Sequence, residues 1–195
     1  FACDLTDAES TTSAMESAIA SLGGVDVLVN NAGVFRITPL LDISSDEWDW
    51  VFAVNTRAML LTTQAAARSM IAQGAGGKIV NMASMGGKVG AAGQAHYAAS
   101  KAGVVAVTRR AAAELAPHGV TVNAISPGPI GDTEGVRRLV ANSPESKKRA
   151  EARIPLGRFG ELDDIGNLAM FLASPYAGYL SGAIIPCDGG GTVEA

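Results

Sequence analysis

The chain has 195 residues, of which 48% are hydrophobic and only 5% aromatic, a composition that favours one globular domain with an aliphatic core. Its formal net charge of -4 and its dispersed lysines and arginines argue against a nucleic-acid surface. Two distant cysteines, Cys3 and Cys187, argue against a disulfide framework or a metal site and favour a cytoplasmic location. No apolar run is long enough for a membrane span, so we expect a small-molecule substrate and neither nucleic acid nor membrane as partner.

Strand-like apolar runs alternate with helical segments along the chain, a pattern typical of βαβ units and a mainly parallel sheet. A capping box from Ser44 to Glu47 marks one helix start. The polar, weakly patterned segment 130–160 is expected to be a mobile flap with one or two short helices. The remaining elements are expected in this order: the tail of a strand over 1–3, a helix over 7–22, a buried strand over 25–30, a helix over 44–73, a strand over 78–83, a helix over 93–116, a strand over 120–126, a helix over 161–174 and a strand over 182–187.

Polar or turn-forming residues follow three of these strands. "NNAG" (30–33), Ser84 and "SPGPI" (126–130) each come where a strand ends. In open parallel sheets the ligand crevice lies outside the carboxyl ends of the strands. These residues are therefore candidates for a binding site, although each also suits an ordinary turn. Asn55 is a poor helix former within the 44–73 helix, and it suggests a polar relay if it faces the crevice.

Tyr97 and Lys101 are four positions apart in "HYAASKAG" (96–103), so they share one face of a helix. A tyrosine that exchanges protons near neutral pH needs its pKa of about 10 lowered by roughly three units, or about 4 kcal/mol. An ammonium about 4 Å away at an effective dielectric constant near 20 supplies that energy. The same pair is also common on solvated helix faces, so the surrounding motifs decide whether it is catalytic.

Seven motifs in order resemble the classical short-chain dehydrogenases/reductases over the whole chain. They are "CDLTD", "NNAG", Asn55 in "VFAVNTRAML", Ser84 in "IVNMAS", "YAASK", "ISPGPI" and "DGG". The resemblance implies an α/β fold, a Rossmann-like doubly wound parallel sheet, with NAD or NADP as cofactor. It also implies a homotetramer or homodimer, in which the helices over 45–73 and 93–116 pair with copies of themselves through small residues at 65–67 and 111–113.

The resemblance assigns roles to individual residues. Tyr97 becomes the general acid/base, Lys101 lowers its pKa and holds the nicotinamide ribose, Ser84 orients the substrate oxygen, and Asn55 joins a water relay that ends at Lys101. The implied cofactor-binding residues are Tyr97 and Lys101 together with Asp4 and Leu5 beside the adenine, Asn31, Ala32 and Gly33 near the adenosine ribose, and Pro127, Gly128, Ile130 and Thr133 on the nicotinamide side.

One family motif, the glycine-rich loop after the first strand, is absent from this sequence. We therefore expect residues 1–195 to form a single, N-terminally incomplete Rossmann-like domain, with residues 130–160 as its substrate flap. Roughly 50 to 60 residues, the size of the first βαβ half, are expected to precede Phe1. Without them the strand over 25–30 exposes an apolar edge. A polypeptide beginning at Phe1 is expected to bind no NAD(P)H.

The leading functional prediction is an NAD(P)-dependent oxidoreductase that interconverts a secondary alcohol and a ketone. One alternative is an acyl-CoA-thioester reductase of the dienoyl-CoA or 3-oxoacyl type, in which Arg137 and Arg138 contact CoA phosphates. A solvated helix face explains the same two arginines. An alternative of another class is a non-catalytic truncated paralogue that acts as a binding or interface protein.

Overall fold

The computed structural model describes residues 1–88, 91–140 and 143–193. Within these ranges no helix is long and apolar enough to cross a membrane. The main elements are α1 (Ala8–Leu22), β1 (Val27–Asn30), α2 (Ser45–Phe52), α3 (Ala58–Gln73), β2 (Gly77–Met82), α4 (Ala95–Leu115), β3 (Val120–Pro127), α5 (Glu134–Leu139), α6 (Pro144–Glu151), α7 (Leu162–Ala173) and β4 (Ile184–Cys187). Short helical turns lie between them: η1 (Leu40–Asp42), η2 (Ala53–Arg57), η3 (Met85–Gly87), η4 (Ala116–His118) and η5 (Pro175–Ala177).

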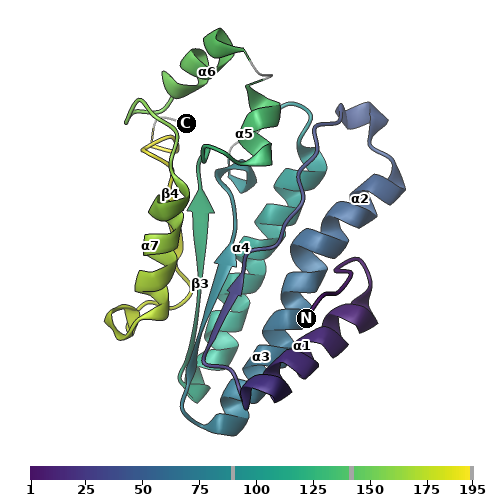
Figure 1. The fold of residues 1–195 in the computed structure, drawn as a ribbon, viewed down its shortest axis with the longest axis vertical. Coiled ribbons are helices and arrows are strands. Elements are labelled where there is room, and N and C mark those ends of the chain that lie inside the picture. The colour runs from purple at the N-terminus through teal and green to yellow at the C-terminus, as the bar shows by residue number, and fades with distance from the viewer. Residues whose placement is uncertain (89–90, 141–142, 194–195) are drawn as a thin grey trace.

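The four strands form one parallel sheet in the order β1-β2-β3-β4. Helices α1, α3 and α4 cover one face and α7 covers the other, as Figure 1 shows. This arrangement confirms the predicted α/β class and parallel sheet. Because all four strands run the same way, their carboxyl ends meet at one edge of the sheet, above which α5 lies (Figure 1).

Alternation along the strands supplies both halves of the core. Ile79 and Val122 point to the α3 and α4 side, where they pack with the fully buried Met70. The neighbouring Val80 and Ile125 point to the opposite side and pack with Leu172 of α7. The sheet is thus buried on both faces at β2 and β3. This packing holds the carboxyl ends of the two strands in place relative to the helices.

The helix predicted over 44–73 is interrupted. Residues 53–57 form the π turn η2 between α2 and α3, and such turns occur frequently at functional sites. Ser44 caps α2 by accepting a hydrogen bond from the Glu47 amide at 3.1 Å. The predicted capping box is only half formed, because the Glu47 carboxylate accepts from the Thr38 hydroxyl instead.

The strand over 25–30 was expected to be buried, and β1 is not. It lies at one edge of the sheet, and the Val27 and Val29 side chains are 41% and 43% exposed. Only its other face is packed, through Leu28 against the α1 and α3 side. The strand therefore presents the apolar, unpaired edge that the sequence predicts.

The segment 130–160 contains two short helices, α5 and α6, as predicted. It also has a small core of its own, made by Val136, Val140, Ile154 and Phe159. Residues 141–142 and the side chain of Arg138 lie outside the described part of the chain. An isolated parallel β-bridge between Ile130 and Gly160 pairs the two ends of the segment with each other.

Candidate active site

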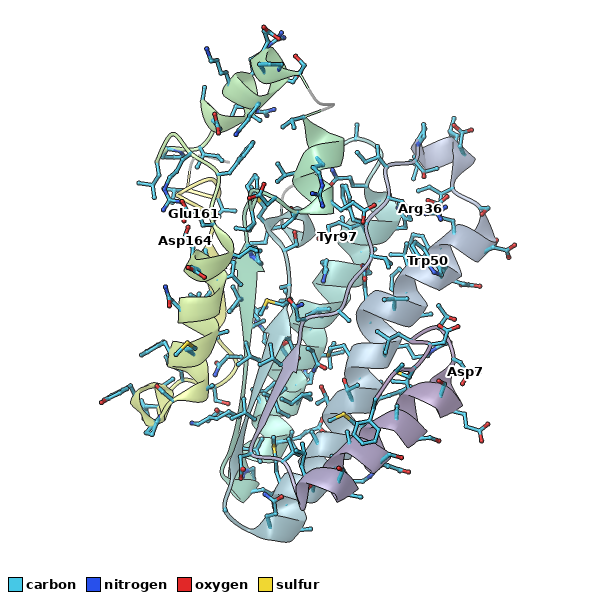
Figure 2. All side chains as sticks on the ribbon, viewed as in Figure 1. Asp7, Arg36, Trp50, Tyr97, Glu161 and Asp164 are labelled. Carbon is cyan, nitrogen blue, oxygen red and sulfur yellow. The ribbon has the colours of Figure 1, made fainter. Side chains whose placement is uncertain are left out.

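The sheet brings the three polar strand ends to the same edge. "NNAG" follows β1, Ser84 follows β2, and Pro127 ends β3, with β1 and β2 paired in register from Val27 to Asn30 and β2 and β3 from Gly77 to Met82. Tyr97 lies near the start of α4, in the upper part of the molecule where these strands end (Figure 2). Four separate segments therefore converge on one region, as the sequence predicts.

Ser84 lies beside Tyr97. The Ser84 side chain caps η3 by accepting from the Gly86 amide at 3.1 Å, and hydrogen bonding with Ser84 acts to lower the pKa of Tyr97. A Cβ atom on Gly86 would lie 3.4 Å from both Ser84 Oγ and a carbon of the Tyr97 ring. Gly86 therefore lies against both hydroxyl-bearing residues.

Lys101 lies below the tyrosine ring and is almost wholly buried. Its side chain is 5% exposed, and Nζ lies 5.9 Å from the centroid of the Tyr97 ring. Nζ donates a hydrogen bond to the Met82 carbonyl oxygen at 2.8 Å. Burial lowers the pKa of Lys101 to about 8, because the charged form is disfavoured away from water.

The pKa of Tyr97 is raised, whereas the resemblance implied that Lys101 would lower it. Burial of the phenol is the main cause, and the hydrogen bond with Ser84 opposes the rise. The ammonium is directed toward the Met82 carbonyl by its hydrogen bond and is not among the causes of the Tyr97 pKa shift. In this state of the chain Tyr97 is therefore a protonated phenol at neutral pH, which is the form of a proton donor.

Asn55 lies in η2 and is 2% exposed. Its Oδ1 accepts from the Val34 amide at 2.8 Å, and its Nδ2 donates to the Val34 carbonyl at 3.0 Å and to Ser100 Oγ at 3.0 Å. The Ser100 hydroxyl in turn donates to the Tyr97 carbonyl oxygen. Asn55 thus joins the loop after β1 to the helix that carries Tyr97 and Lys101.

The turn at Asn31–Gly33 lies over these groups. A Cβ atom on Gly33 would be 3.3 Å from Asn55 Oδ1 and 3.4 Å from Lys101 Nζ, so the bare glycine backbone covers the lysine and the amide. Asn31, Ala32 and Gly33 are all exposed. The exposed backbone of this turn therefore lies directly beside the buried ammonium of Lys101.

The remaining predicted cofactor residues lie on two further loops. Pro127 and Gly128 follow β3, where a Cβ on Gly128 would lie 2.7 Å from the Asp188 Cα, so only glycine fits. The Thr133 hydroxyl donates to the Ile130 carbonyl at 2.7 Å and caps α5. Asp4 and Leu5 lie before α1, in a loop held by the hydrogen bond from Arg57 to Thr6. The described residues contain no cluster of three metal-binding side chains.

Sequence reasoning missed two residues near Tyr97. Phe35 packs edge-on against the Tyr97 ring, with centroids 4.9 Å apart. His96 is completely buried and lies 3.1 Å from the Glu47 carboxylate, measured from Nε2 to Oε1. The only sequence signal is that His96 precedes Tyr97 and that Phe35 follows "NNAG".

Comparisons with known proteins identify the family of the chain. A family model described as enoyl-(acyl carrier protein) reductase matches residues 1–192. A sorbitol dehydrogenase from Cereibacter sphaeroides is 40% identical over 97% of the chain and 77% of its own length. A (3R)-3-hydroxyacyl-CoA dehydrogenase from Rattus norvegicus is 42% identical over 84% of the chain and 62% of its own length.

The fold is also similar to that of a known crystal structure. It is that of an Agrobacterium tumefaciens protein assigned as a 2-deoxy-D-gluconate 3-dehydrogenase, with NADP bound. It is 38% identical, has a TM-score of 0.89, and the match covers 99% of this chain and 76% of that one. The chain belongs to the short-chain dehydrogenase/reductase family of NAD(P)-dependent oxidoreductases.

Proposed function

We propose that the protein interconverts a secondary alcohol and a ketone, with Tyr97 as general acid/base. The observation that carries this proposal is the contact of Ser84 with Tyr97 above the buried ammonium of Lys101, at the carboxyl edge of the sheet. A hydroxyl donor, a proton donor and a fixed cation are the groups that carbonyl reduction requires.

Each residue has a defined task in the reduction direction. The nicotinamide cofactor supplies the hydride. Ser84 donates a hydrogen bond to the carbonyl oxygen and so stabilises the negative charge that develops there. Tyr97 then gives its phenolic proton to that oxygen, and Lys101 stabilises the resulting tyrosinate.

The same residues fit the cofactor. We assign the nicotinamide ribose to Lys101, the adenosine ribose to the exposed backbone of Asn31–Gly33, and the nicotinamide side to Pro127–Thr133. Asp4 and Leu5 are assigned to the adenine. Lys101 suits this role because a desolvated ammonium beside a glycine backbone can donate to ribose hydroxyls without competition from water.

A Tyr97→Phe variant tests the function. Turnover of NAD(P)H with a screen of ketones should fall by about 1,000-fold or more, while calorimetry should show nearly unchanged cofactor binding. Tyr176→Phe is the matched control, since that ring is 89% exposed on the far side of α7. If Tyr97→Phe keeps most of the wild-type rate, the proposed chemistry is wrong.

An acyl-CoA thioester is the second candidate substrate. It is favoured by the identity to the rat (3R)-3-hydroxyacyl-CoA dehydrogenase and by Arg137, which is exposed on α5. Thioesters therefore belong in the same screen, where 3-oxoacyl-CoA turnover above that of simple ketones would favour them. A non-catalytic paralogue would bind cofactor and turn over none of these compounds.

We also propose a domain organisation, an oligomeric state and a location for the protein. Residues 1–195 would be part of one Rossmann-like domain, with residues 130–160 as its substrate flap, in a cytoplasmic homotetramer or homodimer. The alanines at 65–67 cannot provide the contact between copies, because they are only 0–6% exposed and pack inside the chain. Sedimentation that gives a monomer would remove the assembly proposal.

A further inference from the structure

The start of α4, which carries Tyr97, has no side-chain cap. Gln94 occupies the N-cap position and makes no hydrogen bond to the first turn. A helix start without a cap loses about 1 kcal/mol of local stability. Something else must therefore hold the turn on which Tyr97 stands.

His96 is the residue that fastens this turn. Its ring is 0% exposed, and Nε2 lies 3.1 Å from Glu47 Oε1 at the start of α2. Its Nδ1 has no hydrogen-bond partner among the described residues. The Glu47 carboxylate is thus the polar partner that positions this buried ring.

Thr38 closes the arrangement. Its hydroxyl donates to the same carboxylate oxygen of Glu47 at 2.7 Å, and its amide donates to the Gly93 carbonyl at 2.9 Å, just before α4. The Thr38 hydroxyl also lowers the pKa of Glu47 more than any other neighbour does. The carboxylate therefore stays charged and joins three segments: the loop after β1, the start of α2 and the start of α4.

The loop held in this way also touches the reacting group. It carries Phe35, whose ring meets the Tyr97 ring edge-on, at an interplanar angle of 86°. One end of the loop is fixed by the two hydrogen bonds between Val34 and Asn55, and the other end by Thr38 and Glu47. Loss of the hydrogen bonds to Glu47 would free both the first turn of α4 and the Phe35 ring that packs against Tyr97.

We propose that Glu47, His96 and Thr38 form a positioning network that keeps the Tyr97 hydroxyl against Ser84. This inference rests on the proposed function of Tyr97. None of the three residues touches the reacting atoms, so they act through the placement of Tyr97. A displacement of about 1 Å at a reacting group can cost about 100-fold in rate.

Glu47→Gln in the purified enzyme with bound cofactor is the first test. We expect kcat to fall by about 10- to 100-fold, with KM and the cofactor Kd changed less than about twofold. Glu114→Gln, at an exposed position near the end of α4, should leave kcat unchanged. Thr38→Val, which keeps the His96–Glu47 pair, should give a smaller loss of kcat and still fold if Glu47→Gln does not.

A second measurement needs no turnover. The ring Cζ resonance of Tyr97, assigned by its loss in Tyr97→Phe, reports the hydrogen bond with Ser84 at neutral pH. Glu47→Gln should shift this resonance in the same direction as Ser84→Ala. In the double variant the shift should be no larger than in Ser84→Ala alone. A general packing defect would instead give additive shifts.

The outcomes separate the two claims. If the wild-type enzyme turns over no alcohol, ketone or thioester, the proposed function is wrong. The Tyr97 resonance still tests the positioning network in that case. An unmoved resonance together with an unchanged kcat in Glu47→Gln would overturn the network and leave the role of Tyr97 intact.

Discussion

The buried ammonium of Lys101 makes the stability of the folded chain depend on pH in a defined direction. The lysine has a pKa of 10.5 in its unperturbed state and about 8 in the folded chain. Between these values the unfolded state binds more protons than the folded state, so the free energy of unfolding rises with pH. Below about pH 8 both states are protonated, and the folded chain bears the full desolvation cost.

The magnitude follows from the two pKa values. Integration of the linkage relation gives a gain of about 2.5 kcal/mol between about pH 7 and pH 10. Lys101→Met removes the titration but keeps much of the side-chain volume. It also leaves the Met82 carbonyl without its donor, but that cost does not depend on pH. Tyr97 has a raised pKa, so it stays protonated in both folded proteins over most of this pH range.

The measurement is urea denaturation of wild type and Lys101→Met across this pH range, at one protein concentration and without cofactor. The difference in the free energy of unfolding, wild type minus variant, should rise with pH by about 2.5 kcal/mol. Lys148→Met, at an exposed position on α6, should show a flat difference. A flat or falling difference for Lys101→Met would refute the idea that the ammonium is desolvated.

Two further predictions follow from the same site. Asn55→Ala should lower the free energy of unfolding by about 2–3 kcal/mol, because it strips buried partners from Val34 and Ser100. Urea denaturation measures this loss, with exposed Asn31→Ala as control, and equal stabilities would contradict it. Ketone reduction should hold a constant kcat at low pH and decline above about pH 8, as Lys101 loses its charge, whereas alcohol oxidation should rise with pH. Profiles of kcat in both directions measure this, and a reduction rate that climbs with pH would exclude Tyr97 as the donor.

Local chemistry explains why most of the fold could be predicted from the sequence. Asp7 caps α1 by accepting from the Ser10 amide, and Gly23 ends that helix in the left-handed conformation. Pro117 and Gly119 end the α4 region in the same local way. Such signals act within a few residues, so the elements that form differ from the predicted boundaries by one or two residues. The strand predicted over 1–3 was wrong, because residues 1–3 have no regular secondary structure.

The failures involve partners that are distant in the chain. The π turn around Asn55 is stabilised by Val34, 21 residues away. Glu47 has the spacing of a capping box but turns to Thr38 and to His96, 49 residues away. The exposure of Val29 depends on which elements lie beside β1. None of these choices is encoded within a short window of sequence.

The proposed mechanism depends on the incomplete desolvation of Lys101. A pKa of about 8 leaves the ammonium about nine-tenths protonated near pH 7, so the charge survives burial. At 5.9 Å from the tyrosine ring and an effective dielectric constant of about 20, this charge is worth about 3 kcal/mol to a tyrosinate. Burial keeps the phenol protonated before the reaction, and the cation lowers the cost of the phenolate only when the proton leaves. A deeper lysine would lose its charge, and a more exposed one would be screened by water.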